Sequence, residues 1–351
     1  MKQPDKIGHD RYPSSYDNNI SIIPTMRIHP SSLAIIVSIG LSGIGQTQTP
    51  EVPPAPQLPT TPSKTTVGTA DLLAGKRVMI LGDSITQDGT YVSYLEYFLT
   101  KQYPERSFDI INVGLSSETA SGLSEVGHAG GSFPRPCVHE RLQRSLDAVK
   151  PQRVVACYGM NDGIYQPHSE AIMKAFQDGI TKLADSCRAA GAQLILVTPP
   201  VFEGGAYDEV LGKFSEWEVA HPPKGVIAVA DLHTSMAAAR AERRKASPDF
   251  RFTNDNVHPS ELGHVVMAQS ILQGLGIPMP QGKAEDLLAA AHADPLFSLV
   301  CKHRSTRSNG WLNHIGYTRE RTVAPKTGDI EAVEASAKQI QTTINKMIHT
   351  P

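Results

Sequence analysis

The sequence predicts an α/β fold in three layers, with helices on both faces of a parallel sheet. Two observations favour this class. Short apolar segments alternate along the chain with longer amphipathic segments, which is the pattern of repeated strand–helix–strand units. Strands such as 194–197 (LILV) are apolar without alternation, as expected where helices cover both faces of a sheet.

The elements follow one another in a regular order. Five β-rich runs predict strands, near 77–81, 108–113, 153–158, 193–198 and 226–231. Amphipathic patterns predict helices near 91–102, 137–149, 168–190, 207–220, 233–246 and 260–275. In the last helix we expect Pro259 at the first helical position and Gly274 and Gly276 at the end.

These elements make one large domain, which we place at residues 71–278. A length of 351 residues also permits two average domains, but α/β folds often use a single unit of this size. Residues 279–351 form a helical C-terminal extension. It is expected to contain a helix near 283–293, an aromatic-bearing connector over 309–317 and a helix near 330–347.

The N-terminal part of the chain is expected to lie outside the folded domain. Residues 46–70 are rich in proline and threonine, which predicts an extended linker. Residues 1–45 combine an over-extended start with a signal peptide, because a basic segment from Met26, an apolar run and small residues follow in secretory order. We therefore expect translation from Met26 and a secreted or periplasmic mature protein without a stable membrane span. The alternatives are an uncleaved anchor and an ordinary apolar segment.

Charge and composition argue against nucleic acid as a partner. The formal net charge is −2, and lysines and arginines are scattered along the chain. Four widely spaced cysteines predict no disulfide-framed fold and leave any pairing open. Neither His128 nor His139 belongs to an HExxH or similar pattern, so we expect no metal and no cofactor. The sequence carries no signal for an oligomeric state.

Three of the predicted strands end at polar segments. Ser84 follows the first strand in the turn GDS, Gly114 follows the second, and Asn161 follows the third in the segment GMND. Ligands of open α/β sheets bind at the carboxyl ends of the strands. We therefore expect these three residues to converge, although they lie far apart in the sequence.

A fourth segment supplies a base for Ser84. His258 lies three residues after Asp255 in the turn DNVHP. Ser84 needs such a base, because a free hydroxyl is almost fully protonated at neutral pH. With Nε2 of His258 facing the serine and Nδ1 facing Asp255, the three residues form a catalytic triad. The candidate donors to the oxyanion are the backbone N–H groups of Ser84 and Gly114 and the side-chain amide of Asn161.

These blocks resemble those of the SGNH (GDSL-type) hydrolases over about residues 76–275. The segments that carry the resemblance are Gly82-Asp83-Ser84, Gly114, Gly159-Met160-Asn161-Asp162 and Asp255-x-x-His258-Pro259, in the family's order and at similar spacing. The first block reads GDSIT where the family name implies GDSL. The resemblance implies a flavodoxin-like fold with a five-stranded parallel sheet. It also implies Ser84 as nucleophile, Asp255 and His258 as the rest of the triad, and Ser84, Gly114 and Asn161 at the oxyanion hole.

Each of these residues also has an ordinary structural interpretation. Taken singly, the glycines and Asn161 are turn formers, His258 is more often a core or surface histidine, and Asp255 suits an Asx turn. As a set, their mutually compatible roles favour catalysis. Among the other polar residues, Asp83 is expected to cap the next helix or to brace the turn. Arg135 is expected to be solvated, and the alternative is contact with an anionic or carbonyl group of the substrate. For Tyr158, Tyr165 and Trp217 a place in the core is favoured over a place in the cleft.

We therefore expect a secreted serine ester hydrolase that forms an acyl-enzyme on Ser84 and acts on a small-molecule or glycan ester. Within the family, carbohydrate O-deacetylation is favoured, and lipase, lysophospholipase or thioesterase activity is the alternative. An alternative of another class is a non-catalytic glycan-binding protein on the same fold. The intact set of Ser84, Asn161, Asp255 and His258 argues against it.

Overall fold

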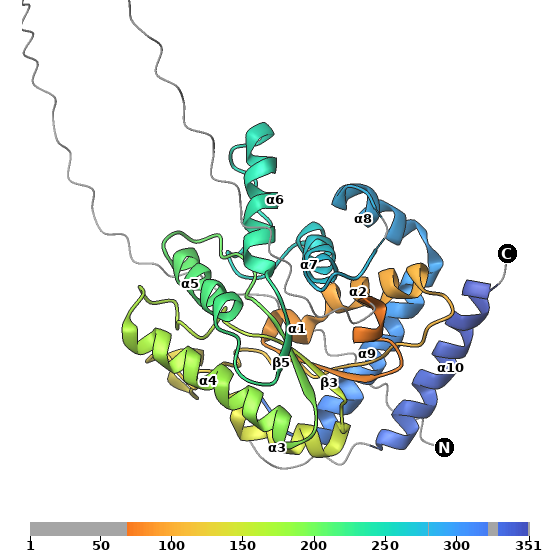
Figure 1. The fold of residues 1–351 in the computed structure, drawn as a ribbon, viewed down its shortest axis with the longest axis horizontal. Helices are drawn as coiled ribbons and strands as arrows, with labels where there is room; N and C mark the ends of the chain where they lie inside the picture. Colours follow the sequence, from red (N-terminus) through yellow and green to blue (C-terminus); the bar gives the residue numbers. More distant parts are fainter. Residues whose placement is uncertain (1–68, 280, 322–328, 350–351) are drawn as a thin grey trace, which may run out of the picture. The chain divides into compact units, whose positions relative to one another are not determined.

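A five-stranded parallel sheet forms the centre of the folded unit (Figure 1). The computed structural model describes residues 69–279, 281–321 and 329–349. The strand order is β2-β1-β3-β4-β5, and every pairing is parallel, which is the flavodoxin-like order. The predicted fold class is therefore confirmed. The expected start, signal peptide and almost all of the expected linker lie outside the described residues.

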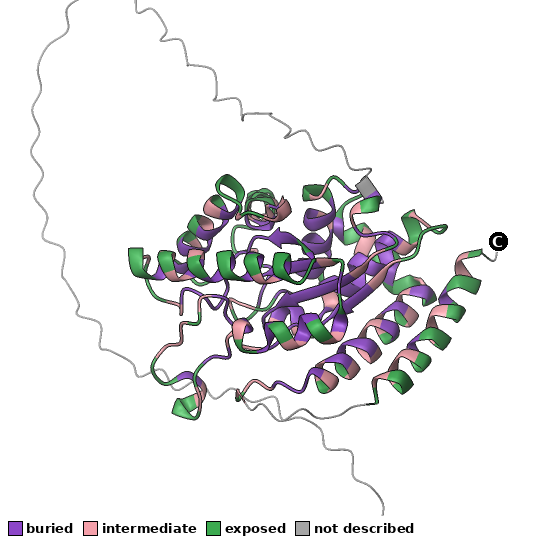
Figure 2. Ribbon diagram, turned by 60° about the horizontal axis from the view of Figure 1, so that its bottom comes forward, coloured by how far each residue is buried: buried purple, intermediate pink, exposed green. Residues whose placement is uncertain are grey.

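The strands end within one residue of the predicted positions. They are β1 (Arg77–Gly82), β2 (Asp109–Asn112), β3 (Arg153–Cys157), β4 (Gln193–Val197) and β5 (Val226–Ala230). Their apolar side chains are mostly buried, and Figure 2 shows the strands enclosed by helices whose outer faces are exposed. Continuous apolar runs therefore predicted these strands well, because both faces of the sheet are covered.

Helices cover both faces of the sheet. They are α2 (Thr90–Gln102), α3 (Val138–Val149), α4 (Glu170–Ala189), α5 (Tyr207–Ala220), α6 (Leu232–Ala246) and α7 (Glu261–Gly274). Shorter elements are η1 (Thr69–Leu72), α1 (Ser84–Asp88) and η2 (His128–Gly131). Figure 1 shows α3, α4 and α5 along one side of the sheet and α2 and α7 along the other. No helix in the described ranges has both the length and the apolarity of a membrane span.

The start of α7 differs from the prediction. Pro259 does not occupy the first helical position, because Ser260 is the N-cap and its side chain accepts the N–H of Gly263. Serine is among the most favourable N-cap residues. Pro259 instead forms an isolated antiparallel bridge with Thr253. This bridge closes the loop that carries Asp255 and His258.

The C-terminal extension contains one helix more than predicted. Its helices are α8 (Ala284–Ala293), α9 (Pro295–Ile315) and α10 (Ile330–His349). The connector expected over 309–317 was wrong, because residues up to Ile315 belong to α9 and Gly316 is its C-cap, with φ 70°. Gly310 lies inside this helix, where an added Cβ would be 2.4 Å from Cγ1 of Val333 in α10. This glycine permits close packing of two helices and does not mark a turn.

The extension packs onto the sheet-forming region. Helix α9 contacts α2, α3 and β2, and α8 contacts α7. Arg307 of α9 donates to the carbonyl oxygen of Ile110 in β2 at 3.0 Å and to Asp109 at 2.6 Å. It also donates to Glu334 of α10 at 3.1 Å. The described part of the extension therefore belongs to the same compact unit as the sheet.

Candidate active site

Ser84 lies directly after the carboxyl end of β1, as the first residue of α1. Asp83 is the N-cap of this helix, and its side chain accepts the N–H of Ile85 at 3.0 Å, which is the capping role expected from the sequence. At Gly82 an added Cβ would lie 2.2 Å from Oγ1 of Thr86 and 2.8 Å from the carbonyl oxygen of Cys157. The turn therefore requires glycine, and it leaves the Ser84 side chain partly accessible.

The Asp83 carboxyl group next to Ser84 is buried. Burial raises its pKa to about 7, against the effect of the hydrogen bond from the N–H of Ile85. The charge of Asp162 also raises this pKa, and the neighbouring His258 and Arg135 lower it. Burial thus favours the neutral form of the carboxyl group that precedes the predicted nucleophile.

The structure brings Ser84, His258 and Asp255 together, although the first two are 174 residues apart in the sequence. Oγ of Ser84 lies 2.8 Å from Nε2 of His258, and Nδ1 of His258 lies 2.6 Å from Oδ2 of Asp255. The His258 and Asp255 side chains are about half exposed, at 50% and 55%. This geometry suits proton transfer from the serine to the imidazole, at a position that solvent and substrate can reach.

Asp255 holds His258 at two points. Its Oδ1 accepts the backbone N–H groups of His258 and Val257 at 2.7 and 3.0 Å. Partial burial acts to raise the pKa of Asp255, but the hydrogen bonds from His258 and Val257 outweigh it and lower the pKa below the ordinary value. The carboxyl group therefore stays charged and keeps the Nδ1 proton of the imidazole on its own side.

A buried carboxylate that the sequence analysis missed fixes the loop of Asp255 and His258. Glu203, whose side chain is fully buried, accepts the backbone N–H of Phe252 at 3.0 Å and pairs with Arg244 at 2.9 Å and Arg240 at 3.4 Å. Its own N–H donates to the carbonyl oxygen of Asn256. Asn256 has φ 75°, a conformation that asparagine tolerates better than most residues. No local motif marks Glu203, because its partners lie more than 35 residues away.

Gly114 occupies a tight position beside α1. An added Cβ would lie 2.6 Å from the backbone nitrogen of Gln87 and 2.8 Å from Cβ of Thr86. Its N–H, predicted as an oxyanion donor, donates to Oδ1 of Asn112 at 3.0 Å. In this structure the predicted donor therefore has an intramolecular acceptor, and the glycine serves the packing of the loop against α1.

Asn161 is buried in the turn after β3, with 4% of its surface exposed. Its Nδ2 donates to the carbonyl oxygen of Glu118 at 3.2 Å, and its Oδ1 accepts the hydroxyl of Tyr165 at 3.0 Å. An amide nitrogen carries two hydrogens, so the contact with Glu118 uses only one of them. The second hydrogen is the predicted oxyanion donor.

Asp162 joins the loops that follow β2 and β3. Its carboxylate accepts the backbone N–H groups of Ala120, Ser121 and Gly159 at 2.8, 2.7 and 2.9 Å. Burial raises the pKa of Asp162, although these hydrogen bonds act in the opposite direction. The aspartate of the GMND segment is therefore a structural link that places Asn161 next to the loop after β2.

Arg135 is buried, contrary to the prediction that it is solvated. It is only 6% exposed and forms a bidentate pair with Glu125, with both distances 2.6 Å. Its guanidinium group also lies over the ring of Tyr165, 5.4 Å from the centroid. Ion pairing and ring contact thus offset the cost of removing this arginine from water.

Tyr158 is in the core as expected, whereas Tyr165 and Trp217 are only partly buried against it.

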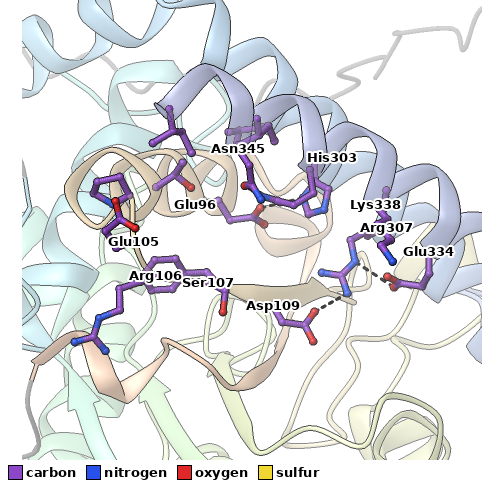
Figure 3. A pocket seen from close by; sticks show the side chains of 18 of the residues that line it. Glu96, Glu105, Arg106, Ser107, Asp109, His303, Arg307, Glu334, Lys338 and Asn345 are labelled. Atoms are coloured by element: carbon purple, nitrogen blue, oxygen red, sulfur yellow. Dashed lines mark hydrogen bonds and ion pairs between the residues drawn. The ribbon is translucent and has the colours of Figure 1, made fainter. Parts of the chain in front are cut away.

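A pocket, shown in Figure 3, lies at the end of the sheet opposite to Ser84, because it is lined by residues that begin the strands. It has a volume of about 750 Å³ and is lined by the residues that begin β1 and β2, Arg77 and Asp109, together with α2, α9 and α10. Glu96 and His303 face each other in it, 3.6 Å apart. The length of β1 separates this pocket from the triad, so we assign the chemistry to the polar residues at the carboxyl ends of the strands.

Neither a disulfide bond nor a candidate metal centre is found among the described residues. All four cysteines are free thiols. Within residues 69–279, 281–321 and 329–349, no group of three or more His, Cys, Asp or Glu side chains is arranged to hold a metal ion. A serine–histidine–aspartate triad needs neither a disulfide bond nor a metal ion to operate.

The chain is similar to one esterase compared by sequence and to two hydrolases of known structure. An acetylxylan esterase from Geobacillus stearothermophilus is 24% identical over 230 residues, covering 58% of this chain and 95% of that protein. The crystal structure of Axe2, an acetylxylan esterase from the same organism, is 19% identical with a TM-score of 0.43, covering 60% of this chain and 99% of the other. LAE5, an α/β hydrolase from the metagenome of Lake Arreo, is 21% identical with a TM-score of 0.43, covering 58% and 96%.

A protein-family model matches the part of the chain that contains the triad. The model described as the GDSL-like Lipase/Acylhydrolase family matches residues 80–266. This range is more than half of the chain, and it contains Ser84, Gly114, Asn161, Asp255 and His258. The chain therefore belongs to the GDSL-like lipase/acylhydrolase family and is a carboxylic ester hydrolase.

Proposed function

We propose that the protein is a carbohydrate O-acetyl esterase that works through an acyl-enzyme on Ser84. The observation that carries the mechanism is the unbroken chain of contacts from Oγ of Ser84 to Nε2 of His258, at 2.8 Å, and from Nδ1 of His258 to Asp255, at 2.6 Å. A serine becomes a nucleophile when a base of this kind accepts its proton.

The reaction runs in two halves. Nε2 of His258 takes the hydroxyl proton as Oγ of Ser84 attacks the carbonyl carbon of the ester, and Asp255 stabilises the imidazolium. The free Nδ2 hydrogen of Asn161 and the N–H of Ser84 receive the oxyanion. His258 then gives its proton to the departing alcohol, which leaves an acyl group on Ser84. In the second half His258 deprotonates a water molecule, and this water releases the acid and restores the serine.

Two features support an acetylated glycan as substrate. The acetylxylan esterase of Geobacillus stearothermophilus is similar over 95% of its own length. In addition, the half-exposed side chains of His258 and Asp255 leave room for a bulky polar alcohol at the reacting ester. We further propose a secreted or periplasmic location, based on the secretory order of residues 26–45. N-terminal sequencing of the mature protein tests the location, and retention of residues 1–45 would contradict it.

The mechanism is tested by labelling with a fluorophosphonate followed by intact-mass analysis. We expect one label per chain in the wild type and none in Ser84→Ala. A wild type that is not labelled, and that binds acetylated glycans without hydrolysing them, would show a binding protein instead of an enzyme.

The substrate class needs a separate assay. Acetylated xylooligosaccharides and other acetylated sugars are compared with p-nitrophenyl esters of increasing chain length. We expect the highest kcat/KM for acetylated sugars. A preference for long acyl chains would favour lipase, lysophospholipase or thioesterase activity at the same triad.

A further inference from the structure

The side-chain amide of Asn161 is held from both ends. Its Nδ2 donates to the backbone carbonyl of Glu118 at 3.2 Å, and its Oδ1 accepts the hydroxyl of Tyr165 at 3.0 Å. A carbonyl oxygen only accepts hydrogen bonds, so the nitrogen must face Glu118. The oxygen then faces Tyr165, whose hydroxyl is able to donate. These two partners allow only one of the two orientations that an amide group can adopt.

Tyr165 is held in an uncommon backbone conformation. Ile164 and Tyr165 have φ values of 47° and 55°, in the left-handed region that is unfavourable for residues other than glycine. The hydroxyl of Tyr207 braces this turn, because it donates to the carbonyl of Met160 and accepts the N–H of Gly163, both at 3.0 Å. Strained residues of this kind persist where the surrounding contacts determine their conformation. The result here is a tyrosine hydroxyl directed at Asn161.

The carbonyl of Glu118 is fixed by a buried ionic group. The Glu118 carboxylate accepts two hydrogen bonds from Arg141, at 2.6 and 2.7 Å, and one from the hydroxyl of Tyr158 at 2.6 Å. The side chains of Glu118 and Arg141 are fully buried. Buried bidentate pairs have little positional freedom, and Arg141 belongs to α3 while Tyr158 follows β3. Glu118 is therefore tied to the same framework that carries Asn161.

We propose that Tyr165, together with the Glu118–Arg141–Tyr158 group, positions the Asn161 amide so that its second Nδ2 hydrogen faces the oxyanion. Tyr165 is thus a positioning residue for the ester hydrolysis proposed above, on which this inference rests. The Glu118 carbonyl excludes the flipped amide, whose oxygen would repel the oxyanion, and the Tyr165 hydroxyl holds Oδ1 so that the amide plane does not rotate away from this position. Donors aimed in advance at the oxyanion give more stabilisation than donors that must reorient.

The test is a double-mutant cycle between Tyr165→Phe and Asn161→Ala, with hydrolysis of p-nitrophenyl acetate as the assay. Phenylalanine keeps the ring that contacts Arg135 and removes only the hydroxyl. We expect Tyr165→Phe to lower kcat about tenfold, with KM within twofold of the wild type. In the Asn161→Ala background the same substitution is expected to change kcat less than twofold, because no amide remains to be oriented.

The matched control is Tyr103→Phe, which also removes a hydroxyl that donates to a carbonyl oxygen, here that of Pro278. It is expected to leave kcat unchanged. The inference is overturned if Tyr165→Phe keeps the wild-type kcat, or if it lowers kcat by the same factor with and without Asn161. If Tyr165→Phe does not fold, Tyr158→Phe replaces it in the double-mutant cycle with Asn161→Ala. This variant loosens Glu118 by removing one hydrogen bond to its carboxylate, and it removes no charge.

A second measurement does not depend on activity. The side-chain amide signal of Asn161 in a ¹H–¹⁵N spectrum, assigned with Asn161→Ala, is expected to show two distinct hydrogens in the wild type and to shift and broaden in Tyr165→Phe. An unchanged signal in the variant would overturn the inference. If the wild type and Ser84→Ala were equally inactive on every ester while this signal still responded, the proposed function would fail and the orientation of Asn161 by Tyr165 would stand.

Discussion

The carboxyl group of Asp255 contacts His258 twice. It accepts the backbone N–H of His258 at 2.7 Å, and it lies 2.6 Å from Nδ1 of the His258 ring. The first contact fixes the turn, and the second fixes the tautomer of the imidazole. A residue that acts at both points affects both the position of the base and its proton. The chemistry at Ser84 is therefore expected to be sensitive to small changes at Asp255.

Asp255→Asn is expected to lower kcat for ester hydrolysis by about 10³- to 10⁴-fold. The amide has almost the same shape as the carboxyl group, but it presents a donor or a neutral oxygen to Nδ1 and no longer stabilises the imidazolium. Steady-state kinetics with p-nitrophenyl acetate measures the effect. The control is Asp185→Asn, which neutralises an exposed carboxylate on α4. A loss of less than tenfold in Asp255→Asn would show that Asp255 does not support the base.

Gly114→Ala is expected to destabilise the fold. Its Cβ would stand 2.6 Å from the nitrogen of Gln87 and 2.7 Å from the backbone carbon of Thr86, and backbone atoms cannot move aside as a flexible side chain does. Overpacking of this kind costs about 1–3 kcal/mol. Urea denaturation measures the free energy of unfolding. Gly212→Ala is the control for steric crowding, because its added Cβ would lie no closer than 3.5 Å to another heavy atom. Equal stability of Gly114→Ala and the wild type would contradict the tight packing.

Glu118→Gln is expected to lower the free energy of unfolding by about 3–5 kcal/mol, because it leaves the charge of Arg141 buried without a counter-charge. The matched exposed pair is Arg188 with Asp185, whose side chains are 52% and 57% exposed. Asp185→Asn is expected to change stability by less than about 1 kcal/mol. Similar losses in the two variants, measured by urea denaturation, would show that burial does not set the importance of the Glu118–Arg141 pair.

His264 gives a prediction for pH. Burial lowers its pKa to about 4 from 6.5, even though Asp88 and Glu261 act to raise it. Between these pH values the unfolded chain binds a proton that the folded protein does not bind. The contribution of the neutral imidazole to stability is therefore fully present above pH 6.5 and is lost as the pH falls toward 4.

We expect His264→Gln to flatten this part of the stability curve, with a difference of up to about 3 kcal/mol between pH 7 and pH 4. Urea denaturation at a series of pH values measures it. The exposed His221 is the control, since His221→Gln is expected to keep the slope of the wild type. A wild-type slope in His264→Gln would mean that other groups cause the acid sensitivity.

Much of this molecule was predictable from local patterns. The strands were found because their apolar runs are short and are bounded by turn residues. Ser84, Asn161, Asp255 and His258 were singled out because each belongs to a recognisable block beside a strand end or a turn. Their convergence follows from the parallel sheet, which gathers the carboxyl ends of its strands at one edge.

The other features depend on contacts between distant parts of the chain. Gly310 was interpreted as part of a connector, because the sequence does not show that Val333 packs against it. Gly114 was assigned to the oxyanion hole from its place after a strand, while its packing against Gln87 became visible only in the structure. Tyr165 is four residues from Asn161, but its hydroxyl reaches the amide only because the turn between them is left-handed.

The hydrogen bond from Arg307 to Ile110 has a consequence for the behaviour of the protein in concentrated solution. Strand β2 has a neighbour on one side only, so its outer row of backbone groups is open to pairing with a strand of another molecule. The guanidinium group of Arg307 in α9 donates a hydrogen bond to one of these carbonyl oxygens, that of Ile110, and the helix itself lies against the strand. Helix α9 lies beyond residue 266, where the match to the family ends. The cover of this sheet edge, which opposes intermolecular β-pairing and aggregation, therefore comes from a segment outside the residues that match the family.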